Sequence, residues 1–165
     1  MRSGTMTIIG ATLILAAAAT GANAGGQTAA APAAASVPVD PAAIVAGRQA
    51  AFLLSAADFG GIKAAIARGD DVTTQAFAAR SLARWAKTIP AMFPAGTGIA
   101  PSEALPTIWT DRAGFEAKAA AYAEAADKLA TLAKAGDKPG FAAQFGEVGK
   151  SCGACHDAYR MPDKK

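Results

Sequence analysis

The sequence predicts an all-α fold, an antiparallel four-helix bundle, and three observations lead to this prediction. The chain is rich in alanine and poor in runs of β-branched residues, a composition that favours helices. Four segments carry apolar residues at steps of three and four, and each begins at an aspartate, a preferred N-cap residue. The joins after the first and third segments are short, which places consecutive helices side by side in opposite directions.

The first helix is expected to begin at Asp40-Pro41, because aspartate caps a helix and proline suits its first turn, and to end near Gly69. Arg48 and Ser55 fall on its apolar stripe, whose other members are Ile44, Phe52, Phe59, Ile62 and Ile66. A buried arginine needs an anion or a route to solvent. The sequence alone leaves open whether that anion is a bound group or a carboxylate of the bundle.

The other three helices are predicted at residues 72–89, 111–135 and 137–160. Pro90 ends the first of these, and Gly136 separates the other two. The connection 90–110 is long and contains four prolines, so we expect it to be functional or packed over the bundle. Its apolar residues are available for that packing: Phe93, Ile99, Leu105, Ile108 and Trp109.

The most informative motif is Cys152-Gly153-Ala154-Cys155-His156, which holds both cysteines and the only histidine of the chain. C-x-x-C-H is the attachment signature of c-type haem: the two thiols form thioether bonds, and the histidine ligates the iron. A structural zinc site needs about four ligands, and a thioredoxin-like pair should follow a strand. We therefore predict one covalent haem c in the bundle core, with the motif on the buried face of the last helix.

The N-terminus has the features of an export signal. A basic residue, Arg2, precedes an apolar run and a small-residue cleavage site ending at Ala24. We predict a signal peptide at 1–24, a flexible Ala/Pro-rich linker at 25–39 and the helical domain at 40–165, with a retained membrane anchor as the alternative. Export to the periplasm agrees with haem attachment, which takes place outside the cytoplasm.

The charge of the chain is nearly balanced. There are 16 Lys and Arg against 13 Asp and Glu, so the net charge is +3, and loss of Arg2 with the signal leaves +2. This excess is too small to indicate nucleic-acid binding. Lys150, Lys164 and Lys165 near the motif would suit an acidic redox partner, although an ordinary solvated surface explains them equally well.

A haem motif near the C-terminus of a helical bundle resembles the class II c-type cytochromes, and within them the cytochrome c′ family. The first helix contributes residues 47–49 with Phe52, and 58–60. The long connection contributes residues 92–97 and 108–109, and the last helix contributes 148–160. The resemblance covers the chain from about Asp40 and is most specific at the C-terminal block.

The resemblance implies roles for individual residues. Phe52 covers the distal face of the haem, where low-spin relatives carry methionine; from periodicity alone it is a core aromatic. Arg48 and Gln49 lie on the propionate side, and Arg160 flanks the proximal side near His156; without the resemblance Arg160 reads as an exposed terminal arginine. Because phenylalanine cannot ligate iron, we expect five-coordinate, high-spin iron that binds NO and CO, with NO able to displace the histidine. A homodimer through the first two helices is also implied.

Three functions follow from these expectations. The first is a periplasmic haem c protein for electron transfer and gas binding. The second is a low-spin electron carrier with Met92 or an external group as sixth ligand, and the third is a haem-free helical binding bundle. We find no Ser/His/Asp arrangement, phosphate loop or paired carboxylates, so no enzymatic activity is predicted beyond redox chemistry at the iron.

Overall fold

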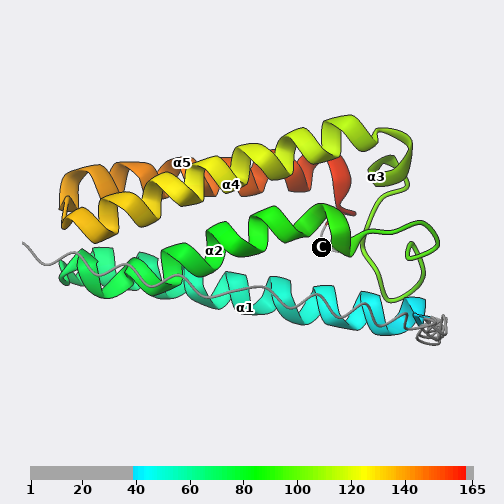
Figure 1. Cartoon of the computed structure of the whole chain (residues 1–165), viewed down its shortest axis with the longest axis horizontal. Helices are drawn as coiled ribbons and strands as arrows, with labels where there is room; N and C mark the ends of the chain where they lie inside the picture. Colours follow the sequence, from blue (N-terminus) through cyan, green and yellow to red (C-terminus); the bar gives the residue numbers. More distant parts are fainter. Residues whose placement is uncertain (1–38, 163–165) are drawn as a thin grey trace, which may run out of the picture. The chain divides into compact units, whose positions relative to one another are not determined.

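The computed structural model describes residues 39–162, which form a bundle of four long helices (Figure 1). The long helices are α1 (Pro41–Arg68), α2 (Ala76–Thr88), α4 (Arg112–Ala135) and α5 (Lys138–Tyr159). Three short elements complete the order: the 3₁₀ turns η1 (Val72–Gln75) and η2 (Ile89–Met92), and the single turn α3 (Thr107–Thr110). The predicted four-helix architecture is confirmed. The predicted signal peptide and nearly all of the predicted linker lie outside the described residues.

The ends of the long helices follow the capping residues in the sequence. The Asp40 carboxylate accepts a hydrogen bond from the Ala42 amide at 2.9 Å and so caps α1. Asp111 and Asp137 cap α4 and α5 in the same way, three residues before Gly114 and Gly140. The helices α1 and α4 end at glycines in the left-handed region, Gly69 with φ 72° and Gly136 with φ 71°.

The structure corrects the predicted second helix at both ends. Residues Val72–Gln75, capped by Asp71, form a 3₁₀ turn rather than the first turn of the α-helix. At the other end, Pro90 does not stop the chain's helical path, because it occupies the first turn of η2, where no amide hydrogen is required. The short helix α3 was not predicted, since four residues carry too little periodicity to detect.

The core is built from the predicted apolar faces. The side chains that are fully buried on it include Ile62, Leu82, Phe115, Leu129 and Phe141. Helix α4 packs against both α2 and α5, and α1 packs against α2. Helix α4 therefore lies between two neighbours, whereas α1 has one long helix, α2, as its main contact.

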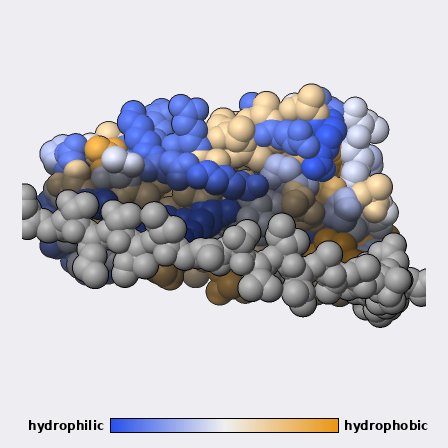
Figure 2. All heavy atoms as spheres, viewed as in Figure 1, coloured by the Kyte–Doolittle hydropathy of each residue, from blue (hydrophilic) through white to orange (hydrophobic). Residues whose placement is uncertain are grey.

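The outer side of α1 remains apolar. Leu53 and Leu54 are 72% and 68% exposed, and Phe77 on α2 is 75% exposed. Figure 2 shows hydrophobic residues at the lower edge of the molecule, where α1 lies in Figure 1, and hydrophilic residues over α4. By length and mean hydropathy (1.4), α1 alone among the described helices could cross a membrane, a test that core helices of soluble proteins also pass.

The long connection folds back onto the end of the bundle, as expected. Phe93 and Ile108 are buried, whereas Ile99 is 42% exposed. The Trp109 indole donates to the carbonyl of Phe93 at 3.2 Å, and Arg112 of α4 donates to the same carbonyl at 3.1 Å. The connection is therefore a packed part of the domain.

Candidate haem-binding site

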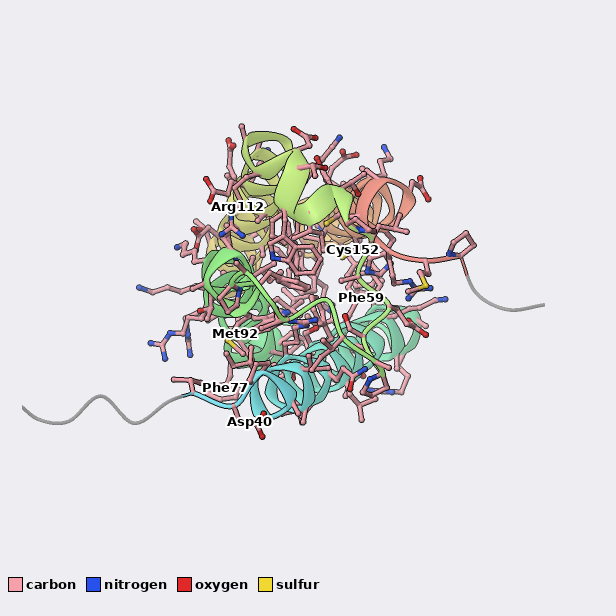
Figure 3. The ribbon with its side chains drawn as sticks, turned by 90° about the vertical axis from the view of Figure 1, so that its right-hand side faces the viewer. Asp40, Phe59, Phe77, Met92, Arg112 and Cys152 are labelled. Carbon is pink, nitrogen blue, oxygen red and sulfur yellow. The ribbon has the colours of Figure 1, made fainter. Side chains whose placement is uncertain are left out.

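A cavity of about 560 Å³ lies between α1 and α5, a volume typical of cofactor pockets. Side chains of α2, α4 and the long connection form the rest of its wall. Every residue that the sequence assigned to the site lines this cavity: Arg48, Gln49, Phe52, Cys152, Cys155, His156 and Arg160. Phe59 of α1 and Cys152 of α5, both labelled in Figure 3, also line it.

Two different structures connect α1 and α5 at the two ends of the cavity. At one end the rings of Phe59 and Phe145 stack with centroids 4.2 Å apart. A Cβ atom on Gly149 would lie 3.4 Å from the Phe59 ring, so this ring also packs against α5 one turn beyond Phe145. At the other end the cavity wall is made by Ser102, Glu103 and Ala104 of the long connection.

The motif cysteines line the cavity as free thiols. Both pack against the hydrophobic core. Burial raises the pKa of the Cys152 thiol, and it also raises that of Cys155, where Lys118 opposes the shift. Both sulfur atoms are therefore protonated at neutral pH and lie one helical turn apart on the same face.

His156 also lines the cavity, on the same helix as the two cysteines, and it lies at the rim, where its side chain is exposed. The imidazole follows Cys155 directly and lies on the wall that faces α1.

The opposite wall is apolar and aromatic. Phe52 on α1 meets the Trp85 ring edge-on at 4.9 Å and lies 6.3 Å from the Phe93 ring. Trp85 and Phe59 both line the cavity. Neither methionine of the described residues lines it; Met92 packs beside Gly47 of α1, apart from Cys152 in Figure 3, and Met161 is 44% exposed.

Arg48 is the largest fully buried side chain of the described residues, at 2% exposure. Its terminal nitrogens donate to four neutral oxygen atoms: the carbonyls of Met92 (3.3 Å) and Thr97 (2.6 Å), and the hydroxyls of Thr97 (2.8 Å) and Ser102 (2.6 Å). The guanidinium also lies 4.3 Å from the centre of the Phe93 ring. None of the ion pairs found within residues 39–162 involves it. A carboxylate of the bundle, one of the partners that the sequence left open for Arg48, is therefore not its partner within these residues; neutral oxygen atoms are.

Gln49 and Arg160 lie at the same end of the cavity as Arg48. The Gln49 amide donates to the carbonyl of Pro101 at 3.1 Å and is exposed. Arg160 is half-buried, and its backbone pairs with Ala104 across an antiparallel bridge. The two arginines thus face the cavity from opposite walls, with the connection between them.

Several wall residues were not identified from the sequence. Ser102, Glu103 and Ala104 come from an irregular segment, which has no periodicity to follow. Lys118 and Tyr122 lie on α4. Burial raises the pKa of the Tyr122 hydroxyl, which keeps it protonated and able to donate a hydrogen bond. The periodic face of α4 indicated Tyr122 as core, but no sequence signal separates core residues from cavity residues.

A family model described as Cytochrome C′ matches residues 43–160. The chain belongs to the cytochrome c′ family. The match includes all four long helices almost completely and all seven predicted site residues. The family consists of periplasmic haem proteins that are not enzymes. The resemblance found in the sequence is therefore confirmed. Membership of this family argues against the third predicted function, a haem-free helical binding bundle.

Curated relatives agree with the family model. Cytochrome c′ of Rubrivivax gelatinosus is 38% identical over 117 residues, which cover 68% of this chain and 90% of that protein. Cytochrome c′ of Alcaligenes xylosoxydans is 48% identical over 65 residues, covering 39% of this chain and about half (51%) of that protein.

Solved structures show the same fold. A nitric oxide complex of a mutant cytochrome c prime from Alcaligenes xylosoxidans matches with a TM-score of 0.70 and 35% identity, covering 76% of this chain and 98% of that one. A carbon monoxide-bound variant of the same protein matches with a TM-score of 0.69 and 35% identity, covering 75% and 98%.

The residues around the cavity fit a covalent haem c, the group that the family implies. The wall combines two thiols, one imidazole and an aromatic surface for a flat apolar ring system. Arg48 places a buried positive charge without a carboxylate partner at one end, where an anionic group would be favourable. Trp85 Nε1 is the one buried side-chain nitrogen or oxygen in the described part of the chain that lacks a hydrogen-bond partner.

Proposed function

We propose that this chain is an exported haem c protein with five-coordinate, high-spin iron, which cycles between Fe(III) and Fe(II) and binds the neutral gases NO and CO. One observation carries the proposal: Phe52 faces the haem motif across the cavity, and no methionine is among the described residues of the wall. Phenylalanine provides no ligand atom, so His156 is the axial ligand, and the described wall supplies no methionine or second histidine as a sixth ligand.

Each residue of the site has a separate task in this proposal. Cys152 and Cys155 hold the haem through thioether bonds, and His156 ligates the iron. The haem supplies the redox-active iron with a sixth position for a small ligand. Phe52 covers that position with an apolar ring, so a polar ligand gains no hydrogen bond there, whereas a small neutral gas binds once the ring moves aside. The NO- and CO-bound relatives support this reading.

The charged end of the cavity suits the propionate groups. Arg48 and Gln49 contribute from α1 and Arg160 from α5. The four hydrogen bonds of Arg48 use the N–H groups of both terminal nitrogens, which leaves the Nε–H group for a carboxylate. Whether or not this Nε–H group binds a propionate directly, the guanidinium charge attracts one, because the hydrogen-bond acceptors around the guanidinium are neutral.

The low-spin alternative requires a sixth ligand, and the position of Met92 speaks against it. Its terminal methyl group lies 3.9 Å from the place of a Cβ atom on Gly47, and neither residue lines the cavity. Sharp low-spin absorption bands in the reduced protein that NO leaves unchanged would establish this alternative.

The covalent attachment is tested by replacing both cysteines. Cys152→Ser together with Cys155→Ser should yield protein without bound haem after denaturation, and with poor folding, because the cavity wall loses the group it is built around. The measurement is haem staining of a denaturing gel, with circular dichroism and urea unfolding in parallel. A double variant as stable as the wild type would count against a core organised by haem.

Export is proposed from the N-terminal sequence and the periplasmic location of the family. The mature protein should begin at Gly25, after removal of residues 1–24. The intact mass of the protein from the periplasmic fraction tests the cleavage site and the mass added by one haem together. A mass that includes residues 1–24 would indicate a retained anchor.

The exposed apolar face of α1 and α2 supports a homodimer. Leu53, Leu54 and Phe77 are each more than two-thirds exposed, and α1 presents mostly alanine and glycine around them. Leu53→Asp should shift sedimentation equilibrium towards the monomer without changing the absorption spectrum. An unchanged molecular mass in this variant would contradict the interface.

A further inference from the structure

The distal and proximal sides of the cavity are joined by a short path through the long connection. The first link is the Arg48 guanidinium on α1, which donates to the Ser102 hydroxyl at 2.6 Å. The second link is the same hydroxyl, which also accepts from the Ala104 amide at 3.2 Å. Ser102 therefore couples the side chain of Arg48 to the backbone of the connection.

The path continues into the C-terminal end of α5. Ala104 pairs with Arg160, and the Arg160 amide donates to the carbonyl of His156 at 3.0 Å. Two further hydrogen bonds fix the same junction: the Met161 amide donates to Glu103 at 2.8 Å, and the Leu105 amide donates to Tyr159 at 3.0 Å. Residues 103–105 of this segment thus form backbone hydrogen bonds with the C-terminal end of α5, the helix that contains the motif.

Three further contacts hold the C-terminal end of α5, and none of them involves α1: the Thr107 hydroxyl donates to the carbonyl of Ala158 at 3.1 Å, the Tyr159 hydroxyl donates to Asp111 at 2.6 Å, and the Tyr159 ring packs edge-on against Phe115. The stacked pair Phe59 and Phe145 joins α1 to α5 at the far end. The Ser102 hydroxyl contacts Arg48, and the backbone of Ala104 pairs with Arg160. Within the described residues, the segment 102–105 is therefore the link from Arg48 on α1 to the end of α5 that bears the motif.

We propose that Arg48 is a positioning residue for the proximal side: through Ser102 and residues 103–105 it fixes Arg160 and the backbone of His156. Arg48 then acts on the axial histidine from the opposite wall of the cavity, in addition to any interaction with a propionate. The proposal rests on the proposed function, because it assigns His156 to the iron. Its structural part concerns only contacts of this chain.

The test uses the haem-loaded protein and three variants. Ser102→Ala removes the shared hydroxyl, and Arg48→Gln removes the guanidinium. Trp109→Phe is the matched control, because the Trp109 indole binds the same connection at the carbonyls of Phe93 and Pro94, makes none of the hydrogen bonds of residues 102–105 found in the described chain, and does not line the cavity. Ser102→Ala keeps the test usable if Arg48→Gln does not fold, since it deletes one small polar group.

Amide hydrogen exchange followed by mass spectrometry reports the coupling. We expect exchange to rise about tenfold in peptides covering 102–107 and also in those covering 157–162, in both Ser102→Ala and Arg48→Gln. The double variant should show little further increase, since both changes break one path. Trp109→Phe should leave residues 157–162 unchanged.

A second measurement separates positioning from stability alone. The iron–histidine stretching band of the reduced protein, recorded by resonance Raman spectroscopy, should shift in Ser102→Ala and stay in place in Trp109→Phe. A rise in exchange limited to residues 102–107, or an equal rise throughout all helices, would overturn the proposal, as would an unshifted band. Failure of the proposed function would look different: the wild-type spectrum would then not respond to NO, whatever the exchange pattern.

Discussion

The position of Phe52 over the iron is best tested by Phe52→Met. A thioether sulfur at this place provides a sixth ligand, so the iron should change from high-spin to low-spin. The structure also sets the cost in stability. The variant loses the edge-on pair with Trp85 at 4.9 Å and the more distant pair with Phe93 at 6.3 Å. An aromatic pair contributes about 0.5–1.5 kcal/mol, and a phenylalanine-to-methionine exchange nearly conserves volume.

The expected destabilisation is therefore about 1–2 kcal/mol, or roughly 5 °C in melting temperature. Spin state is read from absorption and electron paramagnetic resonance spectra, and stability from urea unfolding. Phe59→Met is the control, because it makes the same change two turns along the same wall and loses a comparable ring pair, with Phe145. A high-spin Phe52→Met variant whose CO affinity equals that of the wild type would refute the placement of Phe52 over the iron.

Three further predictions concern the scaffold. Phe141 is fully buried and does not line the cavity. Phe141→Ala should lower the free energy of unfolding in urea by about 3–5 kcal/mol and leave the absorption spectrum unchanged; a spectral change would mean that the core and the site are not separate. The hydrogen bond from the Tyr159 hydroxyl to Asp111 (2.6 Å) raises the pKa of Tyr159 to about 12. Because the neutral form is favoured in the folded state, stability should be complete below pH 10 and fall between pH 10 and 12, and Tyr159→Phe should lack this fall in urea titrations over that range; an identical fall in the variant would exclude Tyr159 as its source. Gly136→Ala should destabilise by about 1 kcal/mol because φ is 71°, whereas Gly146→Ala, within α5 and with open space around it, should stabilise by a similar amount; the same sign for both in thermal unfolding would contradict the helix-cap argument.

Helix ends were predictable where a side chain decides them. Asp40, Asp111 and Asp137 mark the three helix starts, and Gly69 and Gly136 mark two ends, because capping and positive φ depend on local chemistry. The 3₁₀ turns around α2 were missed because their spacing hardly differs from that of an α-helix over four residues.

The site was predictable on the helices and not in the connection. Periodicity and the motif brought Phe52, Cys152 and His156 to one cavity. The partners of Arg48 could not be predicted, because Thr97 and Ser102 reach it through an irregular backbone with no repeating pattern. The sequence indicated that this arginine needs a polar partner, and only the structure shows that neutral oxygen atoms provide it.

The most direct test of the central claim is the absorption spectrum of the purified periplasmic protein, in the ferric state and after reduction with dithionite, with and without NO. The account predicts broad high-spin bands that shift when NO is added to the reduced protein. Sharp low-spin α and β bands that NO leaves unmoved would contradict it, because a sixth ligand would then occupy the position that Phe52 is proposed to cover. The absence of a Soret band would remove the haem site itself.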